Sequence, residues 1–529
     1  MLLNRRFVPA LVGAVLPLAL APGLVLPARA AGDPSAPPAD SSPRALRVLA
    51  QAEATLQQAL PSSLRGSGGA RTEAHDATLA LLALRHALPQ LDRRDRTRAR
   101  ALFARPDGTN GTRYDLSSTR WTTTDTAAAK STCDDPTTYG VHPFCVHWVP
   151  EGTTTGGLLP SPSRQVATDD AVAETVRAMS HVWSTEIGTL GYRAPRGDGA
   201  TGSEQVPTAD KLDVYLADSG ASRGGAVYGY AVPEAFTGQT SPGYLVLDND
   251  FSSAQFGTAT TPDAARDVTA AHEFFHLVQF AYDTGESSWL MESTATWMEE
   301  RAYSAVNDNR QYIASSSLHW PGQPVDTFVA GDVPQYGTWV FHELLSEHLG
   351  NAVIRRVWGR AAAVPGNNAR SALSSALRSE GSSLLAEFRR FSGGSIAPAR
   401  FWHEGGAWPR AVISRTWTLS RASRSTGLHA TTLDHLASVD VVMQPKSTLT
   451  ADWKLRIHID GPSSGGTAYI LVFFRDGSAR KLPLGLDGSG NRTYSVPFSA
   501  SKVSRVALAL GNASATDGRT TAFRATIWR

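Results

Sequence analysis

Two histidines and a glutamate near the middle of the chain have a spacing that could bind and use a metal ion. His272, Glu273 and His276 form the pattern H-E-x-x-H within the run Thr269–Glu300. On a helix, residues four apart lie on one face, so both imidazoles can hold one ion while the glutamate reaches a water beside it. By chance, this pattern is expected on the order of 0.02 times in such a chain. We therefore predict one catalytic zinc ion.

A catalytic zinc takes three protein ligands and keeps one position for water, so a third ligand is required. A metzincin would have a histidine six residues after the second histidine, where this chain has Tyr282. Our candidate is Glu292, in a second predicted helix that folds back on the first, and Asp283 is the alternative. Glu292 could instead be a buried structural carboxylate paired with Arg301. We expect Glu299–Glu300 to form a solvated end of this helix.

The segments that precede the motif predict the elements that position it. A strand-like run at Phe144–Val149 is followed by a helix with an apolar 3.6-residue period, capped by Asp169 or Asp170. Two further strand-like runs come next, and the motif helix has Pro262 at its first position, which favours initiation. This order of helix, small sheet and H-E-x-x-H helix is that of a zincin-like domain.

Helical and then strand-like patterns follow the motif. We expect helices at Gln335–Leu349, Ala352–Ala362 and Asn368–Phe391, which form a mainly helical lower subdomain. From about Leu433, short alternating strands separated by turns predict a β-sandwich accessory domain. The predicted fold class is therefore α+β. The expected divisions are a signal peptide at 1–30, a helical segment at 31–107, a zincin-like domain at 108–400, a linker at 401–432 and the β-sandwich at 433–529.

The start of the chain indicates export. Basic, apolar and small-residue stretches follow one another in residues 1–30, which is typical of a secretory signal peptide. No later stretch has the ~18 uninterrupted apolar residues of a membrane span. Two runs with helical spacing follow, at Ala45–Leu60 and Thr72–Leu88. They are either a removable pro-segment or a permanent helical layer.

The two cysteines, Cys133 and Cys145, lie in one loop-rich stretch. In an exported chain with only these two thiols, we expect a disulfide that closes the loop. The net charge of +2 is spread along the chain, which argues against a nucleic-acid partner. We expect a protein or peptide substrate and a monomeric chain, although no motif sets the oligomeric state.

Six segments of the sequence carry a family resemblance. In order they are FCVHW, LDVYLAD, YGYAVPE, GYLVLDND, the run Ala271–Asp283 and WLMESTATWMEE. Together they resemble a family of secreted bacterial zinc metalloproteases with a gluzincin-like site, over roughly Cys133–Gly359. The resemblance implies zinc ligation by the two motif histidines and Glu292, with Glu273 as general base. Thr296 stands where the best-known gluzincins place an aspartate that orients the first histidine, so that role is unassigned.

These features predict a secreted zinc endopeptidase. Zinc lowers the pKa of its water, and Glu273 takes the proton and returns it to the leaving amine. Tyr336, at the start of a helix after the site, is our candidate oxyanion donor, with a packing role as the alternative. Two other functions stay open: a zinc hydrolase of a non-peptide amide or ester, and a binding module with a residual metal site.

Overall fold

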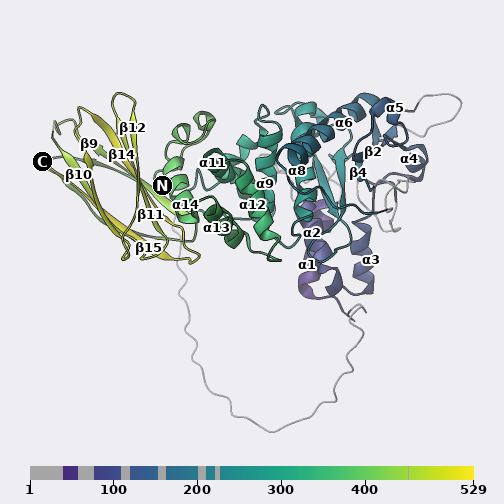
Figure 1. Cartoon of the computed structure of the whole chain (residues 1–529), viewed down its shortest axis with the longest axis horizontal. Helices are drawn as coiled ribbons and strands as arrows, with labels where there is room; N and C mark the ends of the chain where they lie inside the picture. Colours follow the sequence, from purple (N-terminus) through teal and green to yellow (C-terminus); the bar gives the residue numbers. More distant parts are fainter. Residues whose placement is uncertain are drawn as a thin grey trace, which may run out of the picture.

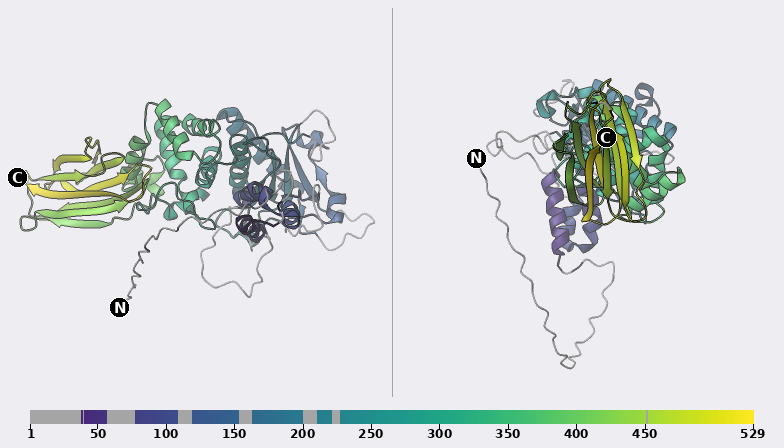
Figure 2. Two further views of the ribbon diagram at one scale, coloured as in Figure 1. Left: turned by 90° about the horizontal axis from the view of Figure 1, so that it is seen from below. Right: turned by 90° about the vertical axis from the view of Figure 1, so that its left-hand side faces the viewer.

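The structure of the protein is a computed structural model. It describes residues 38, 40–56, 77–108, 119–152, 163–199, 210–220, 227–450 and 452–529, so the predicted signal peptide lies outside the described residues. Figure 1 shows helices with a mixed sheet at one end, a group of helices in the middle and long strands at the C-terminal end. The left view of Figure 2 shows the same succession. The chain is therefore mixed α+β with a sheet-rich C-terminal region, as predicted.

A mixed sheet forms the framework of the first region. Its strands are β1 (Lys130–Ser131), β2 (Phe144–Pro150), β3 (Val166–Ala167), β4 (Leu212–Ala217), β5 (Gly229–Pro233) and β6 (Gly243–Asp248). Among the described residues, the order is β1-β2-β4-β6-β5, with β3 beside β2. Strands β2, β4 and β6 are parallel neighbours, whereas β5 runs antiparallel to β6 at the edge.

Helices cover both faces of this sheet. The helices of this first region are α1 (Pro43–Leu56), α2 (Ala77–Ala87), α3 (Arg93–Ala101), α4 (Thr123–Ala128), α5 (Pro136–Tyr139) and α6 (Asp169–Trp183). Successive strand residues point to opposite faces, so Val214 and Leu216 join a core with α6 and α8 (Pro262–Phe280), while Tyr215 and Ala217 join a core with α1, α2 and α3. The N-terminal helices are therefore packed on the sheet.

The start of α6 corrects one sequence prediction. Thr168, not Asp169 or Asp170, caps the helix, because its hydroxyl accepts a hydrogen bond from the amide of Ala171 at 3.1 Å. The two aspartates occupy the first turn, where their negative charges interact favourably with the positive end of the helix dipole.

Two helices form the centre of the molecule. They are α8 (Pro262–Phe280), capped by Thr261 with Pro262 at its first position as predicted, and α9 (Ser288–Ala302), capped by Ser287. Both are buried around most of their circumference, which places them in the interior between the sheet and the later helices.

The middle region is mainly helical, as expected. It contains α10 (Pro334–Gly337), α11 (Trp339–Leu349), α12 (Ala352–Ala361), α13 (Ala369–Ser379) and α14 (Leu384–Ser395), and the short α7 (Ser253–Phe256) precedes α8. The predicted helix Gln335–Leu349 is divided at Thr338. The predicted helix Asn368–Phe391 is divided into α13 and α14, and Gly381, with a left-handed φ of 73°, lies between them. No helix in the described part of the chain is long and apolar enough to cross a membrane.

The C-terminal region consists of two sheets with a shared apolar core. In the described residues the orders are β13-β10-β15-β8 and β12-β11-β14-β9-β7. The strands are β7 (Arg415–Leu419), β8 (Ser425–Leu433), β9 (Ala437–Pro445), β10 (Lys454–Asp460), β11 (Gly466–Phe474), β12 (Ala479–Leu484), β13 (Asn491–Pro497), β14 (Val503–Asn512) and β15 (Arg519–Trp528).

The boundary of this region corrects a second prediction. The range 401–432, expected to be a linker, contributes β7 and most of β8. Both are edge strands with many exposed residues, so they lack the alternating apolar pattern that marks the later strands.

Asp440 connects the second of these sheets to the helical region. Its Oδ2 accepts a hydrogen bond from the Ser395 hydroxyl of α14 at 3.2 Å, while Oδ1 has no hydrogen-bond partner among the described residues. Burial raises the pKa of Asp440 to about 8. In the unfolded chain an aspartate ionises near pH ~4, so the folded state is favoured most below that pH and loses this advantage as pH rises toward about 8.

We predict that Asp440→Asn removes this pH dependence, because the amide carries no charge to bury. Between pH 5 and pH 9 the wild-type melting temperature should fall by about 2 °C or more beyond that of the variant, as measured by calorimetry. Asp460→Asn, at an exposed position on β10, is the control. Equal slopes for the wild type and Asp440→Asn would contradict the assignment.

Candidate metal centre

The predicted motif forms a buried cluster on one face of α8. His272, Glu273 and His276 each offer a ligand atom, and these atoms lie within 4.8 Å of one another. Their exposed fractions are 3%, 1% and 0%. The helical spacing read from the sequence therefore brings the three side chains together.

Glu292 of α9 completes this cluster. Its Oε2 lies 3.1 Å from Nε2 of His272 and 3.7 Å from Nε2 of His276. The side chain is fully buried. Burial alone would raise the pKa of Glu292, but the nearby His276 and His272 lower it to about 2. One carboxylate oxygen and two imidazole nitrogens thus converge on a single point between the two helices.

Unsatisfied atoms at this point suit a cation. Among the described residues, His276 Nε2 and Glu292 Oε1 are buried and have no hydrogen-bond partner. Buried polar atoms are usually paired, and an absent ion is one explanation when they are not. Two imidazoles and a carboxylate are also a ligand set that zinc takes in catalytic sites. The residues therefore fit the predicted metal.

The other ring nitrogens are held by second partners. Nδ1 of His272 lies 2.6 Å from Glu299 Oε1, and Nδ1 of His276 lies 2.8 Å from Gln279 Oε1. The Gln279 amide in turn donates to the carbonyl of Met291 at 2.9 Å. Such contacts orient each ring so that Nε2 faces the metal position.

Glu299 and Glu300 correct a third prediction, because both are buried and neither forms a solvated helix end. The Thr296 hydroxyl donates to the carbonyl of Glu292 in its own helix at 3.0 Å. The orienting carboxylate for His272 therefore comes from Glu299. The acidic pair at the end of the second helix was the available sequence signal, but only the packing of α9 on α8 reveals which member faces the histidine.

Glu273 has a different environment from the candidate ligands. Its Oε2 accepts hydrogen bonds from the Thr78 hydroxyl at 2.7 Å and from the Ala231 amide at 3.1 Å. Burial raises the pKa of Glu273. Because Oε2 is engaged by these donors, Glu273 is suited to proton transfer beside the metal position and Glu292 is suited to ligation.

The alternative ligand is engaged elsewhere. Asp283 accepts a hydrogen bond from the amide of Gly285 at 2.9 Å through Oδ1 and from the amide of Gly366 at 2.8 Å through Oδ2. Both oxygens therefore secure the turn between α8 and α9. This arrangement leaves Glu292 as the third candidate ligand.

Two tyrosines pack near the cluster. Tyr336 on α10 is 1% exposed, and its ring centroid is 6.1 Å from that of His272. Tyr312, which the sequence did not single out, packs against Tyr336 with ring centroids 5.4 Å apart. Tyr312 also lines a cavity of about 20 Å³ with His272 and Glu273. A cavity of this size is on the order of one water molecule.

Glu186 is a further buried carboxyl group that the sequence analysis missed. It lies in a π-helical turn, Ser184–Thr189, that continues α6. Neither of its oxygens has a hydrogen-bond partner among the described residues, and burial raises its pKa well above the usual value. A protonated Glu186 adds no negative charge to the neighbourhood of His272, whose positive form opposes this shift.

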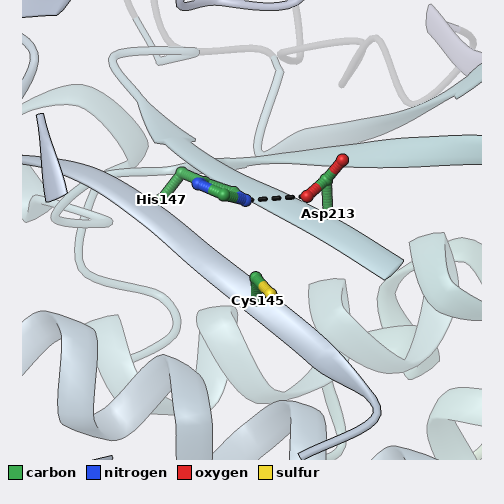
Figure 3. A group of neighbouring side chains, drawn as sticks. All are labelled: Cys145, His147 and Asp213. Atoms are coloured by element: carbon green, nitrogen blue, oxygen red, sulfur yellow. Dashed lines mark hydrogen bonds and ion pairs between the residues drawn. The ribbon is translucent and has the colours of Figure 1, made fainter. Parts of the chain in front are cut away.

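A second group of side chains that could bind a metal ion lies on the sheet. Cys145 and His147 on β2 lie near Asp213 on β4, and Figure 3 shows His147 bonded to Asp213 at 2.8 Å. Cys145 is joined to Cys133, which confirms the predicted disulfide and removes the thiol as a ligand. Asp213 also pairs with the buried guanidinium of Arg105. This cation leaves no need for a metal, so the group is structural.

The comparisons with known proteins give no family for the chain. No family model and no curated protein matches it. One similar solved structure is a family GH115 4-O-methyl-alpha-glucuronidase with specificity for decorated arabinogalactans, at 10% identity and a TM-score of 0.14. The match covers 50% of this chain and 38% of that one. A score this low carries no argument about fold or activity.

We predict that Glu299→Gln weakens zinc binding about 10- to 100-fold, because the neutral amide orients and polarises His272 less strongly. The affinity is measured by competition with a chelator of known strength. Glu300→Gln is the matched control, since Glu300 is the next residue of α9 and accepts a bond from Asn309 instead. The role of Glu299 would be rejected if the two variants bound zinc equally well.

Proposed function

We propose that this protein is a secreted zinc endopeptidase with a zincin-like catalytic domain and a gluzincin-like site. The carrying observation is the convergence of His272, His276 and Glu292 on one point, with Glu273 beside it. The order of sheet, α8 and α9 and the antiparallel edge strand β5 support the fold assignment. The Cys133–Cys145 disulfide supports an exported location, because disulfides persist in oxidising compartments.

The proposed chemistry divides the roles among named side chains. His272, His276 and Glu292 would hold zinc, which supplies Lewis acidity and lowers the pKa of water. Glu273 accepts a proton from the attacking water and later donates it to the leaving amine. A carboxyl group whose pKa burial has raised is better matched to this exchange near neutral pH than an exposed glutamate. Tyr336 is the proposed donor to the developing oxyanion.

One observation favours a second candidate, a zinc hydrolase of a small amide or ester. The cavity beside His272 and Glu273 is only about 20 Å³, which admits no polypeptide in the present arrangement. A small substrate requires less opening of the site than a peptide does. The two candidates share the metal centre and the base, so they are separated by substrate and not by ligand variants.

We predict that Glu292→Ala purifies without zinc, because two imidazoles alone are an incomplete ligand set. Asp283→Ala should keep one zinc per chain although it loses two backbone hydrogen bonds and some stability. Metal content is measured by mass spectrometry of the purified proteins. Full zinc occupancy of Glu292→Ala together with loss from Asp283→Ala would reverse the assignment.

We predict that Glu273→Gln lowers peptide hydrolysis 10²- to 10⁴-fold while zinc content stays near wild type, because the amide cannot accept a proton. His272→Ala should lose both zinc and activity, since it removes a ligand. A peptide library digested by the mature protein supplies the substrate, and a panel of small amides and esters tests the second candidate. Wild-type turnover by Glu273→Gln on any of these substrates would reject the proposed mechanism.

A further inference from the structure

Strand β5 is an edge strand, and helix α2 contacts two of its outward hydrogen-bonding groups, one of which also bonds Glu273. The amide of Ala231 donates to the Thr78 hydroxyl at 2.8 Å. The carbonyl of Pro233 accepts from the Arg85 guanidinium at 2.8 and 3.1 Å. Ala231 and Pro233 are alternate residues, so both groups face the unpaired side of the strand. These are the groups that an extended peptide uses when it adds to a sheet edge.

Helix α2 also contacts α9 and the turn that precedes α9. His86 Nε2 lies 2.9 Å from the carbonyl of Thr284 in that turn. Leu79 and Leu82 belong to the same apolar core as Met291, the residue before the candidate ligand Glu292. Helix α2 therefore lies between the edge strand and the helix that carries the third ligand.

Helix α2 also contacts the proposed general base directly. The Thr78 hydroxyl donates to Glu273 Oε2 at 2.7 Å, and Thr78 is fully buried. The space left beside Glu273 and His272 is the cavity of about 20 Å³. With α2 in this position, side chains of α2 occupy the Ala231 amide and the Pro233 carbonyl at the edge of β5 and lie beside Glu273.

We propose that α2 is an internal inhibitor that occupies the peptide-binding edge of β5, and that hydrolysis requires α2 to move away from it. This inference rests on the proposed endopeptidase function. The side chains of α2 replace the backbone of a bound peptide: the Thr78 hydroxyl acts as the carbonyl acceptor, and the Arg85 guanidinium acts as the amide donor. Substrate and α2 therefore compete for the same two groups of β5.

The anchoring of the segment indicates that this motion is local. Leu91 and Phe103, which follow α2 in the chain, lie in the apolar core beneath the sheet together with α1 and α3. Beyond α3, Arg105 is fixed in buried ion pairs with Asp198, Asp213 and Glu234. The chain thus stays attached on the far side of α2 while the helix leaves the edge.

The test uses the full chain with Arg85→Ala and with the double variant Arg85→Ala/His86→Ala, which leave the site residues and Thr78 unchanged. Arg98→Ala is the matched control, because Arg98 pairs with Glu53 inside the same helical segment and does not contact β5. Hydrogen exchange at 77–87 and at Ala231 reports on the position of α2. The rate at which phenanthroline removes zinc reports on access to the site without requiring activity.

In the double variant we expect faster exchange, zinc removal about tenfold faster and peptide hydrolysis about tenfold higher, roughly the factor for losing one or two hydrogen bonds. The control should match the wild type. Faster exchange without faster zinc removal or hydrolysis would overturn the proposal and make α2 a structural layer, and unchanged exchange would overturn it as well. If zinc removal accelerates but no variant cleaves any peptide, α2 still controls access and the endopeptidase function alone fails.

Discussion

The packing of α8 against α9 creates a buried concentration of negative charge on which the site depends. Glu273, Glu292 and Glu299 surround two imidazoles, and each carboxylate is at least nine-tenths buried. Three carboxylates with neutral histidines carry a formal charge of −3, and a divalent cation reduces it to −1. Burial by itself would lower the pKa of His272, but Glu292 and Glu299 raise it well above its usual value. Burying these charges in an apolar interior destabilises the fold unless every charge has a partner.

The edge of the first sheet poses the second physical problem. An unpaired strand edge attracts other chains, and proteins cover or charge such edges. Here Thr78 and Arg85 cover β5 with side chains, which leaves the backbone groups available once the helix moves. A further strand paired with β5 would instead have closed the edge with backbone hydrogen bonds. The same contacts can therefore protect the protein from aggregation and keep the site closed.

The C-terminal sheets are attached through α14 and lie far from the metal centre along the axis in Figure 1. Tyr469 of β11 packs so closely on α14 that a side-chain carbon at Gly393 would meet its ring at 2.4 Å. Phe401 continues this contact, with its ring centroid 5.6 Å from that of Tyr469. The sheets are thus fixed to the helical region by packed aromatic rings and the buried Asp440.

The sequence by itself determined the local features of this protein. Spacing on one helix aligned His272 with His276, and Pro262 marked the first position of that helix. A spacing of twelve residues in an irregular stretch paired the cysteines. Each of these depends on neighbours along the chain, where helical geometry and short loops leave few alternatives.

Only the tertiary structure decided which distant groups meet. Glu299 faces His272 while Glu300 turns away, and this choice depends on the rotation of α9 about its axis as it packs on α8. Thr78 meets Glu273 across 195 positions because α2 crosses the edge of a sheet whose strand order no local pattern encodes. Strands β7 and β8 have largely exposed residues without an apolar pattern, and only their pairing with β9 and β15 defines them as strands. Packing between distant segments sets these contacts, and a pattern of neighbours along the chain carries no record of them.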